Sequence, residues 1–291
     1  MKFIIGVIIV FGCVLGGYTM HHGKLAVLYQ PTEFLIIVGA AVGSFVIGNP
    51  SHVIKGVLKS LKFLLKGNPY KKQDYVDLLV TLYQTFKLIK SKGMLEVEGH
   101  IENPHESSIF KNNPKLMHNH HAMDFLCSYL RMMTMGMEDY YQLDDQMQRD
   151  IDAMHAEEHA IPDAVNTMAD AMPALGIVAA VLGVIVTMGS ITEPPEILGG
   201  LIGAALVGTF LGVLLSYALL APMSKYIAAH FVGEGEYVHA IRVAMLAHLK
   251  GNAPVVSVEF ARCSVQPTVR PTFVDVENAI NNAAVPAAAA S

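Results

Sequence analysis

The stretch MHAEEHAIP, residues 154–162, holds the side chains whose spacing most readily suggests chemistry. His155, Glu158 and His159 spell H-x-x-E-H, which on a helix sets two imidazoles four residues apart beside a carboxylate, as in some zinc peptidases. A zinc site also needs a further ligand and a pocket. Residues 137–163 hold nine acidic residues and one arginine, a composition typical of a solvated helix face. We interpret the match as coincidence and expect no metal there.

Other catalytic patterns are weaker still. The cluster HNHH, residues 118–121, follows Pro114 in a polar connection, where surface histidines are ordinary. No P-loop, GxSxG or GxGxxG motif occurs in a suitable context. Cys13, Cys127 and Cys263 are widely spaced and indicate neither a disulfide framework nor a zinc ribbon. The sequence therefore does not predict an enzyme, and we expect no cofactor.

The composition points to a membrane protein. Of the 291 residues, 53% are hydrophobic and 15% are charged, whereas soluble domains carry about 25% charged residues. The net charge of −5 argues against nucleic acid as a partner. Four uncharged apolar runs predict four transmembrane helices, at residues 3–19, 34–49, 173–191 and 197–223. The first run could instead be a cleaved signal peptide, but Gly16-Gly17-Tyr18 is a poor cleavage site and a second span follows soon.

The predicted fold class is an all-α membrane protein with a large helical cytoplasmic domain. We divide the chain into residues 1–49, with spans 1 and 2; 50–170, a cytoplasmic lobe; 171–223, with spans 3 and 4; and 224–291, a cytoplasmic helix with a disordered, low-complexity tail. The lysine-rich segment 50–73 sets the orientation, because positive residues favour the cytoplasmic side, and both termini are then cytoplasmic.

Within this lobe, Lys55, Lys59, Lys62 and Lys66 share helical spacing. The helix 51–66 either lies on the anionic inner leaflet or presents an ordinary solvated face. Residues 74–92 predict a helix that Gly93 can cap, and residues 121–160 a second long helix. Met132, Met133, Met135 and Met137 are expected to be adaptable core residues. We expect no β-sheet.

The interiors of the spans hold no ionisable side chain, because Lys2, Glu33 and Asp170 lie at or beyond the edges. Only small polar groups remain inside, at Ser44, Thr187, Ser190, Thr209 and Ser216. If the protein moves protons, another chain must bring the carboxylate. Pairs of glycines four residues apart predict close helix packing and an oligomer; they are Gly12/Gly16, Gly39/Gly43, Gly199/Gly203 and Gly208/Gly212.

Several longer motifs resemble the motility protein A family, the four-span subunits of the bacterial flagellar stator within the wider MotA/TolQ/ExbB proton channel family. The resemblance runs through about residue 280. Its motifs are GGYTM (16–20), LYQPTEFLIIVGAAVGSFVIGN (28–49), IENPHESSIF (101–110), MPALGIVAAVLGV (172–184), VGTFLGVLLSYALLAPM (207–223) and RPTFVDVE (270–277).

The resemblance implies a homopentamer in the bacterial inner membrane that surrounds two copies of motility protein B. An aspartate of that partner binds and releases H⁺, and the movement that follows applies torque to the rotor protein FliG. The missing carboxylate would then belong to the partner. The alternative is an ExbB/TolQ-like energiser of an outer-membrane system, which would share the membrane core but not the IENPHESSIF motif.

The resemblance also implies residue roles. Pro173 and Pro222 match the prolines that couple ion binding to movement, and Thr209 matches the hydroxyl that faces the partner's aspartate. Ala180 stands where sodium-driven relatives carry threonine and so favours protons, since a methyl group is no cation ligand. Lys90 and Glu98 match the rotor contacts, with Lys90 in place of the family's arginine, which loses the bidentate fork.

Overall fold

The computed structural model describes residues 2–65 and 70–283, and every regular element in these ranges is a helix, as predicted. Lys66 and the predicted tail beyond Ala283 lie outside the described residues. The chain divides into two compact units. The first unit comprises Met1–Gly67 and Glu157–Phe231, and the second comprises Asn68–Ala156 and Val232–Ser291.

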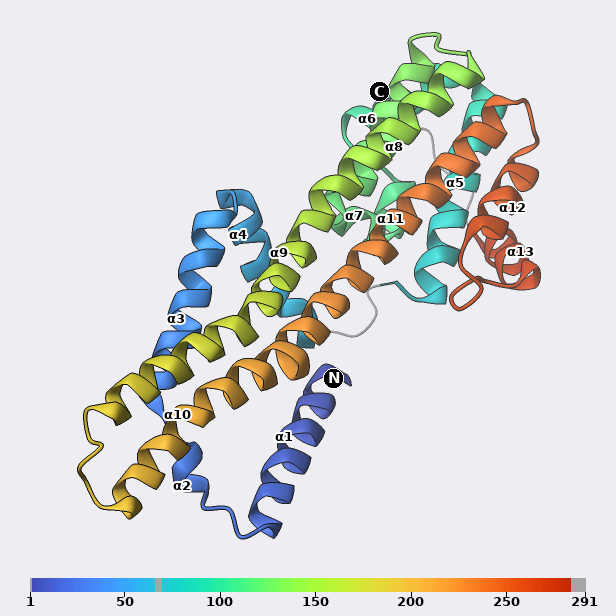
Figure 1. Cartoon of the computed structure of the whole chain (residues 1–291). Coiled ribbons are helices and arrows are strands. Elements are labelled where there is room, and N and C mark those ends of the chain that lie inside the picture. The colour runs from blue at the N-terminus through green and yellow to red at the C-terminus, as the bar shows by residue number, and fades with distance from the viewer. Residues whose placement is uncertain (1, 66–69, 284–291) are drawn as a thin grey trace. The chain divides into compact units, whose positions relative to one another are not determined.

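The first unit is a set of helices (Figure 1). Its elements are α1 (Lys2–Met20), α2 (Leu25–Leu28), α3 (Pro31–Gly48), α4 (Ser51–Ser60), a 3₁₀ turn (Leu61–Leu65), the later part of α9 (Tyr140–Met188), α10 (Pro195–Leu215), a π-helical segment (Ser216–Leu220) and the start of α11 (Ala221–Leu249). Four helical stretches among the described residues are long and apolar enough to cross a membrane: Lys2–Met20, Leu25–Gly48, Tyr140–Met188 and Pro195–Leu249. Each of the four predicted apolar runs thus falls largely in a helical stretch of sufficient length.

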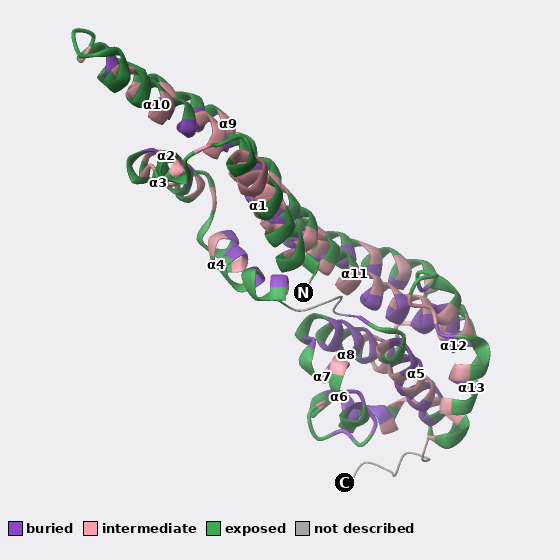
Figure 2. Cartoon of the chain, turned by 90° about the horizontal axis from the view of Figure 1, so that it is seen from below, coloured by how far each residue is buried: buried purple, intermediate pink, exposed green. Residues whose placement is uncertain are grey.

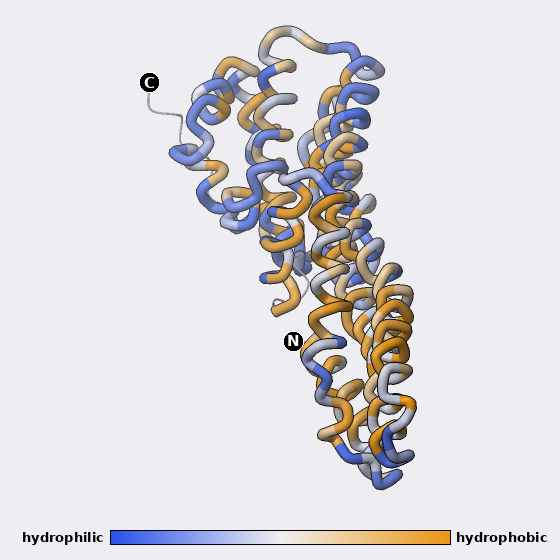
Figure 3. The backbone as a smooth tube through the Cα atoms, turned by 60° about the vertical axis from the view of Figure 1, so that its left-hand side comes forward, coloured by the Kyte–Doolittle hydropathy of each residue, from blue (hydrophilic) through white to orange (hydrophobic). Residues whose placement is uncertain are grey.

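Large apolar side chains of this unit point outward. Ile8 is 65% exposed, Ile47 is 89% exposed and Val186 is 67% exposed. Figure 2 shows exposed residues along much of α1, α9 and α10, and Figure 3 shows that α1, α10 and the later part of α9 are largely hydrophobic. An apolar helix surface that remains exposed is expected where lipid or another membrane helix covers it.

The lysine-rich helix is shorter than predicted, because α4 ends at Ser60 and a tighter 3₁₀ turn continues to Leu65. Val57 and Leu64 are buried, while Lys55, Lys59 and Lys62 are exposed. Leu58 and Leu65 are exposed beside the lysines. This arrangement is compatible with both predictions for the segment, contact with lipid and an ordinary solvated face.

The second unit is a helical domain with its own core, visible as the buried residues of α5 and α8 in Figure 2. Its elements are α5 (Lys72–Lys92), a 3₁₀ turn (Met94–Val97), α6 (Glu98–Glu102), a 3₁₀ turn (Phe110–Asn112), α7 (Pro114–His118), α8 (His120–Thr134), the early part of α9, the later part of α11, α12 (Pro254–Ser264) and α13 (Phe273–Asn282).

Apolar side chains from successive turns of α5, including Leu78, Leu82 and Phe86, are fully buried in this core. Polar side chains fix the connections: Asn113 accepts the Leu116 N–H at 2.9 Å and donates to the Tyr237 hydroxyl at 3.3 Å. The motif IENPHESSIF closes a similar turn. The Ser107 hydroxyl accepts the N–H groups of Ile109 and Phe110, both at 3.2 Å.

Two predictions for this unit need correction. The expected single helix over 121–160 is two helices, since α8 ends at Thr134 and α9 begins at Tyr140. Gly136 has a φ of +90°, a conformation that breaks the helix and suits glycine. Of the four methionines, Met133 is buried and Met132 and Met137 pack partly against the core, but Met135 is 74% exposed in this break.

Candidate functional site

The backbones of α9 and α10 approach each other closely in the first unit. A methyl group built on Gly212 would lie 2.7 Å from the Met172 carbonyl oxygen and 2.9 Å from the Gly176 Cα. One built on Gly183 would lie 2.7 Å from the Ala205 Cβ. We call Gly176, Gly183, Ala205, Gly208 and Gly212 the glycine seam. The predicted close packing of Gly208/Gly212 is confirmed, and its partners are Gly176 and Gly183.

The other predicted glycine pairs are used differently. Methyl groups built on Gly12, Gly16, Gly39, Gly43 or Gly199 would meet nothing within 4 Å in the described part of the chain, and one on Gly203 would only touch Val27 at 4.0 Å. These helix faces therefore stay available for neighbouring helices.

Glu33 lies in the glycine seam and was misjudged from the sequence. It occupies the first turn of α3, as its place near the edge of the span predicts, but it is only 7% exposed. Its Oε2 lies 2.8 Å from a methyl built on Gly208. The prediction that the spans enclose no acid was wrong, because hydropathy counts residue types and does not show which face a side chain occupies.

Three predicted residues flank the seam. Pro173 directly follows Met172, whose carbonyl oxygen contacts Gly212. The Ala180 backbone nitrogen lies 3.3 Å from a methyl built on Gly208, and the Thr209 Cα lies 3.3 Å from one built on Gly176. All three are half-buried. The structure thus brings Pro173, Ala180 and Thr209 together along one helix contact and leaves part of each accessible.

Pro173 lies inside a helix, and Pro222 lies where a π-helical segment runs into the next helix. Pro173 is in the middle of α9. Pro222 is the second residue of α11, and the π-helical segment Ser216–Leu220 directly precedes that helix. Proline lacks an N–H group and its ring would clash with the carbonyl of Ala218, four residues earlier, so the backbone widens there. Pro222 itself is exposed.

Lys90 and Glu98 belong to the second unit, whereas the glycine seam belongs to the first. Lys90 is in the last turn of α5, and Glu98 begins α6. Between them Gly93, with a φ of +93°, caps α5 by donating its N–H to the Ile89 carbonyl at 2.9 Å, which confirms its predicted role. Both charges are exposed, and among the described residues neither forms an ion pair.

Two histidines of the second unit, His100 and His248, have lowered pKa values. Burial, and then the charge of Lys90, lower the pKa of His248, which stacks on Phe86 with ring centroids 4.4 Å apart. Burial also lowers the pKa of His100. Because the Ser107 hydroxyl accepts two backbone N–H groups, it donates its own hydrogen to His100 Nδ1 at 2.9 Å. The lowered pKa values favour the neutral form of both histidines in the fold.

The histidine motifs have structural roles instead of ligand geometry. Among the described residues, no group of three His, Cys, Asp or Glu side chains could hold a metal ion. His155 packs against Gly235. In the HNHH cluster, Asn119 caps α8 by accepting the Ala122 N–H at 3.0 Å, and His118 donates to the Pro114 carbonyl at 2.6 Å.

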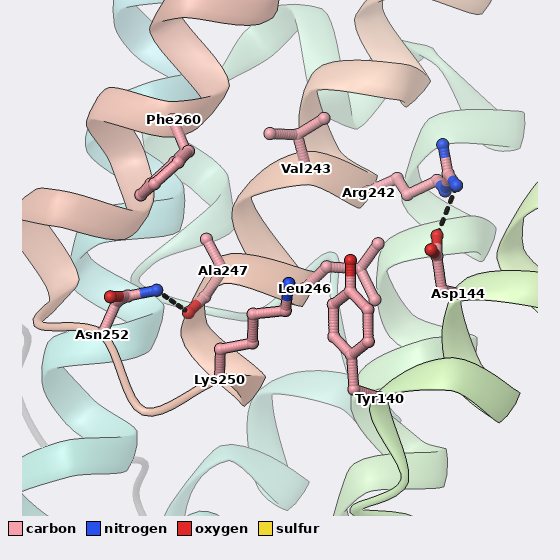
Figure 4. A pocket seen from close by; sticks show the side chains of 9 residues that line it. All are labelled: Tyr140, Asp144, Arg242, Val243, Leu246, Ala247, Lys250, Asn252 and Phe260. Atoms are coloured by element: carbon pink, nitrogen blue, oxygen red, sulfur yellow. Dashed lines mark hydrogen bonds and ion pairs between the residues drawn. The ribbon is translucent and has the colours of Figure 1, made fainter.

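An open pocket of about 310 Å³ lies in the second unit between α9, α11 and α12 (Figure 4). Arg242 and Asp144 form an ion pair at its edge, and the Lys250 ammonium lies 3.9 Å from the ring centroid of Tyr140. Asn252 donates to the Ala247 carbonyl at 2.8 Å. These polar side chains already have partners within the protein. We therefore interpret the pocket as a packing gap where the helices meet.

The fold is similar to two solved MotAB structures. One, described as the structure of MotAB from C. jejuni, matches with a TM-score of 0.75 at 18% identity, over 91% of this chain and 96% of that chain. The other, the flagellar MotAB stator complex from Bacillus subtilis, matches with a TM-score of 0.69 at 24% identity, over 88% of this chain and 92% of that one. At these identities the likeness shows the fold.

Sequence relatives extend the comparison. The chain is 38% identical to motility protein A of Escherichia coli strain K12 over 277 residues, which are 95% of this chain and 94% of that protein. It is 36% identical to motility protein A of Salmonella typhimurium, over 95% and 94%. It is 33% identical to chemotaxis protein LafT of Vibrio parahaemolyticus, over 95% and 97%.

Two family models match separate parts of the sequence. The model described as motility protein A N-terminal matches residues 4–93, and the model of the MotA/TolQ/ExbB proton channel family matches residues 117–237. The second match includes the glycine seam and Pro173, Ala180, Thr209 and Pro222. Since these models cover most of the chain and its relatives align along nearly their whole length, the chain belongs to the motility protein A family.

Proposed function

We propose that this chain is a stator subunit of a bacterial flagellar motor, which conducts protons together with a motility protein B partner and applies torque to the rotor protein FliG. The observation that carries the proposal is the 38% identity to a motility protein A over 95% of the chain. The match to the proton channel family supports H⁺ as the transported ion.

The assembly we propose is a homopentamer around two copies of motility protein B in the bacterial inner membrane. The glycine faces without a partner in the described chain, at Gly12/Gly16 and Gly39/Gly43, support such helix neighbours. Residues 50–170 and 224–291 would then be cytoplasmic and residues 1–49 and 171–223 membrane-bound, with both termini inside. The lysines of α4 support this orientation.

The roles that we propose in coupling ion binding to movement are based on where each residue lies in the membrane helices. Thr209 is proposed to face the partner's ion-binding aspartate, and Ala180 to leave that place without a cation ligand. Pro173 and Pro222 are proposed to let α9 and α11 change shape when the aspartate gains or loses its proton. Proline in a helix supports this, because it removes one hydrogen bond from the ladder.

Lys90 and Glu98 are proposed to contact FliG as opposed charges. Both lie on the surface of the second unit, and neither has an ion-pair partner among residues 2–65 and 70–283. Such exposed charges steer a partner by long-range attraction. Charge reversal at Lys90 or Glu98 is expected to reduce torque without loss of assembly, and a compensating reversal on FliG should restore it. Motor torque measured on tethered cells tests this. Full torque in both single variants would contradict the contact.

The alternative, an ExbB/TolQ-like energiser of an outer-membrane system, shares the second family model. The match of residues 4–93 to the motility protein A N-terminal model favours the stator.

A complementation experiment tests the proposal. The chain is expressed with its own motility protein B in a flagellated strain that lacks both proteins. Swimming should return, should stop on addition of a protonophore and should not depend on external sodium. Failure to swim despite correct membrane insertion of both chains would contradict the stator function, and sodium-dependent swimming would contradict the choice of proton.

A further inference from the structure

Glu33 is buried at the start of α3, and the proposed mechanism gives it no role. It is 7% exposed, and its Oε2 is fully buried without a hydrogen-bond partner in the described part of the chain. Ile37 and Ala41, one and two turns later, are buried on the same face of α3. The side chain is therefore turned into the bundle.

Two glycines make the space that the carboxyl group fills. A methyl on Gly208 would lie 2.8 Å from Glu33 Oε2, and a methyl on Gly183 would lie 3.6 Å from Glu33 Oε1. Gly183 belongs to α9 and Gly208 to α10. The two oxygens thus lie between these helices, at the position directly before Thr209.

A structural role at the start of the helix does not explain this placement. A carboxylate in the first turn often stabilises a helix by accepting its free N–H groups. Here Oε2 accepts none, and among the described residues Glu33 takes part in no salt bridge.

The surroundings of the carboxyl group carry no compensating charge. The packed parts of α9, from Met172 to Met188, and of α2 contain no titratable residue. The single one in α10 is Glu196, which is exposed, and Lys24 beside α2 is also exposed. A bare carboxylate without partners costs several kcal/mol to bury, so this space accepts the neutral acid more readily.

We propose that Glu33 is a proton-binding site of this chain's own, a relay carboxyl that delivers protons along the Thr209 side of the glycine seam toward the partner. The proposal rests on the proposed function as a proton-conducting stator. A proton binds to one carboxylate oxygen as an O–H bond. That bond breaks when the proton moves on, and the next proton neutralises the carboxylate, so no co-reactant is needed.

The direct test is proton flux through the complex of this chain with its motility protein B, reconstituted in vesicles that contain a pH-sensitive dye. Glu33→Gln keeps the shape of the side chain but removes the carboxyl group that binds the proton. Proton flux should therefore fall about a hundredfold, the usual scale for loss of a positioned proton-transfer group. Glu33→Asp should retain part of the flux. Glu196→Gln, the same change at an exposed position, is the matched control and should conduct like wild type.

Wild-type flux in Glu33→Gln would overturn the inference while leaving the stator function intact. Absence of flux in the wild-type complex would instead count against the stator function. If Glu33→Gln fails to assemble, infrared spectra of the wild-type and Glu33→Asp complexes decide the matter. A protonated carboxyl band that shifts in Glu33→Asp supports the site, and identical bands in both complexes contradict it.

A second pair of variants tests the geometry. Gly208→Ala would place its methyl group 2.8 Å from Glu33 Oε2, so it should displace the carboxyl group and reduce proton flux. Glu33→Asp shortens that side chain by one methylene, so the double variant should conduct better than Gly208→Ala alone. If the losses of proton flux in the two single variants simply add in the double variant, this would contradict direct contact between Glu33 and Gly208.

Discussion

Gly212→Ala is expected to destabilise the first unit because the new methyl group meets only backbone. It would lie 2.7 Å from the Met172 carbonyl oxygen, 2.9 Å from the Gly176 Cα and 3.2 Å from the Gly176 nitrogen. None of these atoms belongs to a flexible side chain that could turn away. Moving from 2.7 Å to the 3.4 Å at which ordinary contact begins requires about 0.7 Å of separation between α9 and α10.

The expected cost follows from this displacement. Overpacking of a well-packed interior costs about 1–3 kcal/mol, whereas alanine in a helix gains about 1 kcal/mol over glycine. The net effect is a loss of up to about 2 kcal/mol. Gly200→Ala is the matched control, since it lies in the same helix and its methyl would meet nothing within 4 Å. The assay is thermal unfolding of the purified complex, followed by swimming speed.

The two variants should differ in sign. Gly200→Ala should leave the melting temperature unchanged or slightly raised, and Gly212→Ala should lower it and reduce the yield of assembled complex. A Gly212→Ala complex that is as stable as the Gly200→Ala complex would refute the close approach of the two helices in the seam.

The remaining predictions concern coupling and pH. Pro222→Ala restores an N–H group opposite the Ala218 carbonyl, so the widened turn can relax to a regular α-helix; assembly should persist while swimming is lost, and full motility in this variant would contradict the coupling role. His248 is neutral in the fold, and the unfolded chain binds more protons as the pH falls below about 6.5, so stability should decrease from neutral toward acidic pH. His248→Gln should flatten the dependence of melting temperature on pH, and an unchanged slope would exclude His248 as a cause.

Much of the architecture could be predicted because it depends on local composition. Long uncharged runs identified the four spans, and the helix over 74–92 appears as α5 with Gly93 as its cap. Gly251 likewise follows the end of α11 with a φ of +84°. These features follow from the desolvation of charges and from glycine's access to positive φ, both of which can be read from neighbouring residues.

The predictions failed where tertiary contacts or a single backbone conformation, and not local composition, determine the structure. The long helix predicted over 121–160 is instead divided at residues 135–139. The break at Gly136 was missed because the apolar spacing on both sides is helical.

The candidate site was predicted in pieces. The Gly208/Gly212 spacing indicated close packing, but nothing in it named the opposite helix. Gly176 and Gly183 are seven residues apart, which is two helical turns, and this signal could have identified them as the facing pair. The burial of Glu33 depends on the contact between α3 and those glycines, and a single chain's hydropathy does not contain that contact.

The central claim is that proton passage requires this chain and motility protein B together. The decisive measurement is proton flux into vesicles that contain the purified chain alone, its motility protein B alone, or both. The account predicts flux only when both chains are present and loss of that flux when the partner's ion-binding aspartate is replaced by asparagine. Sustained proton flux through vesicles that contain this chain alone would contradict it.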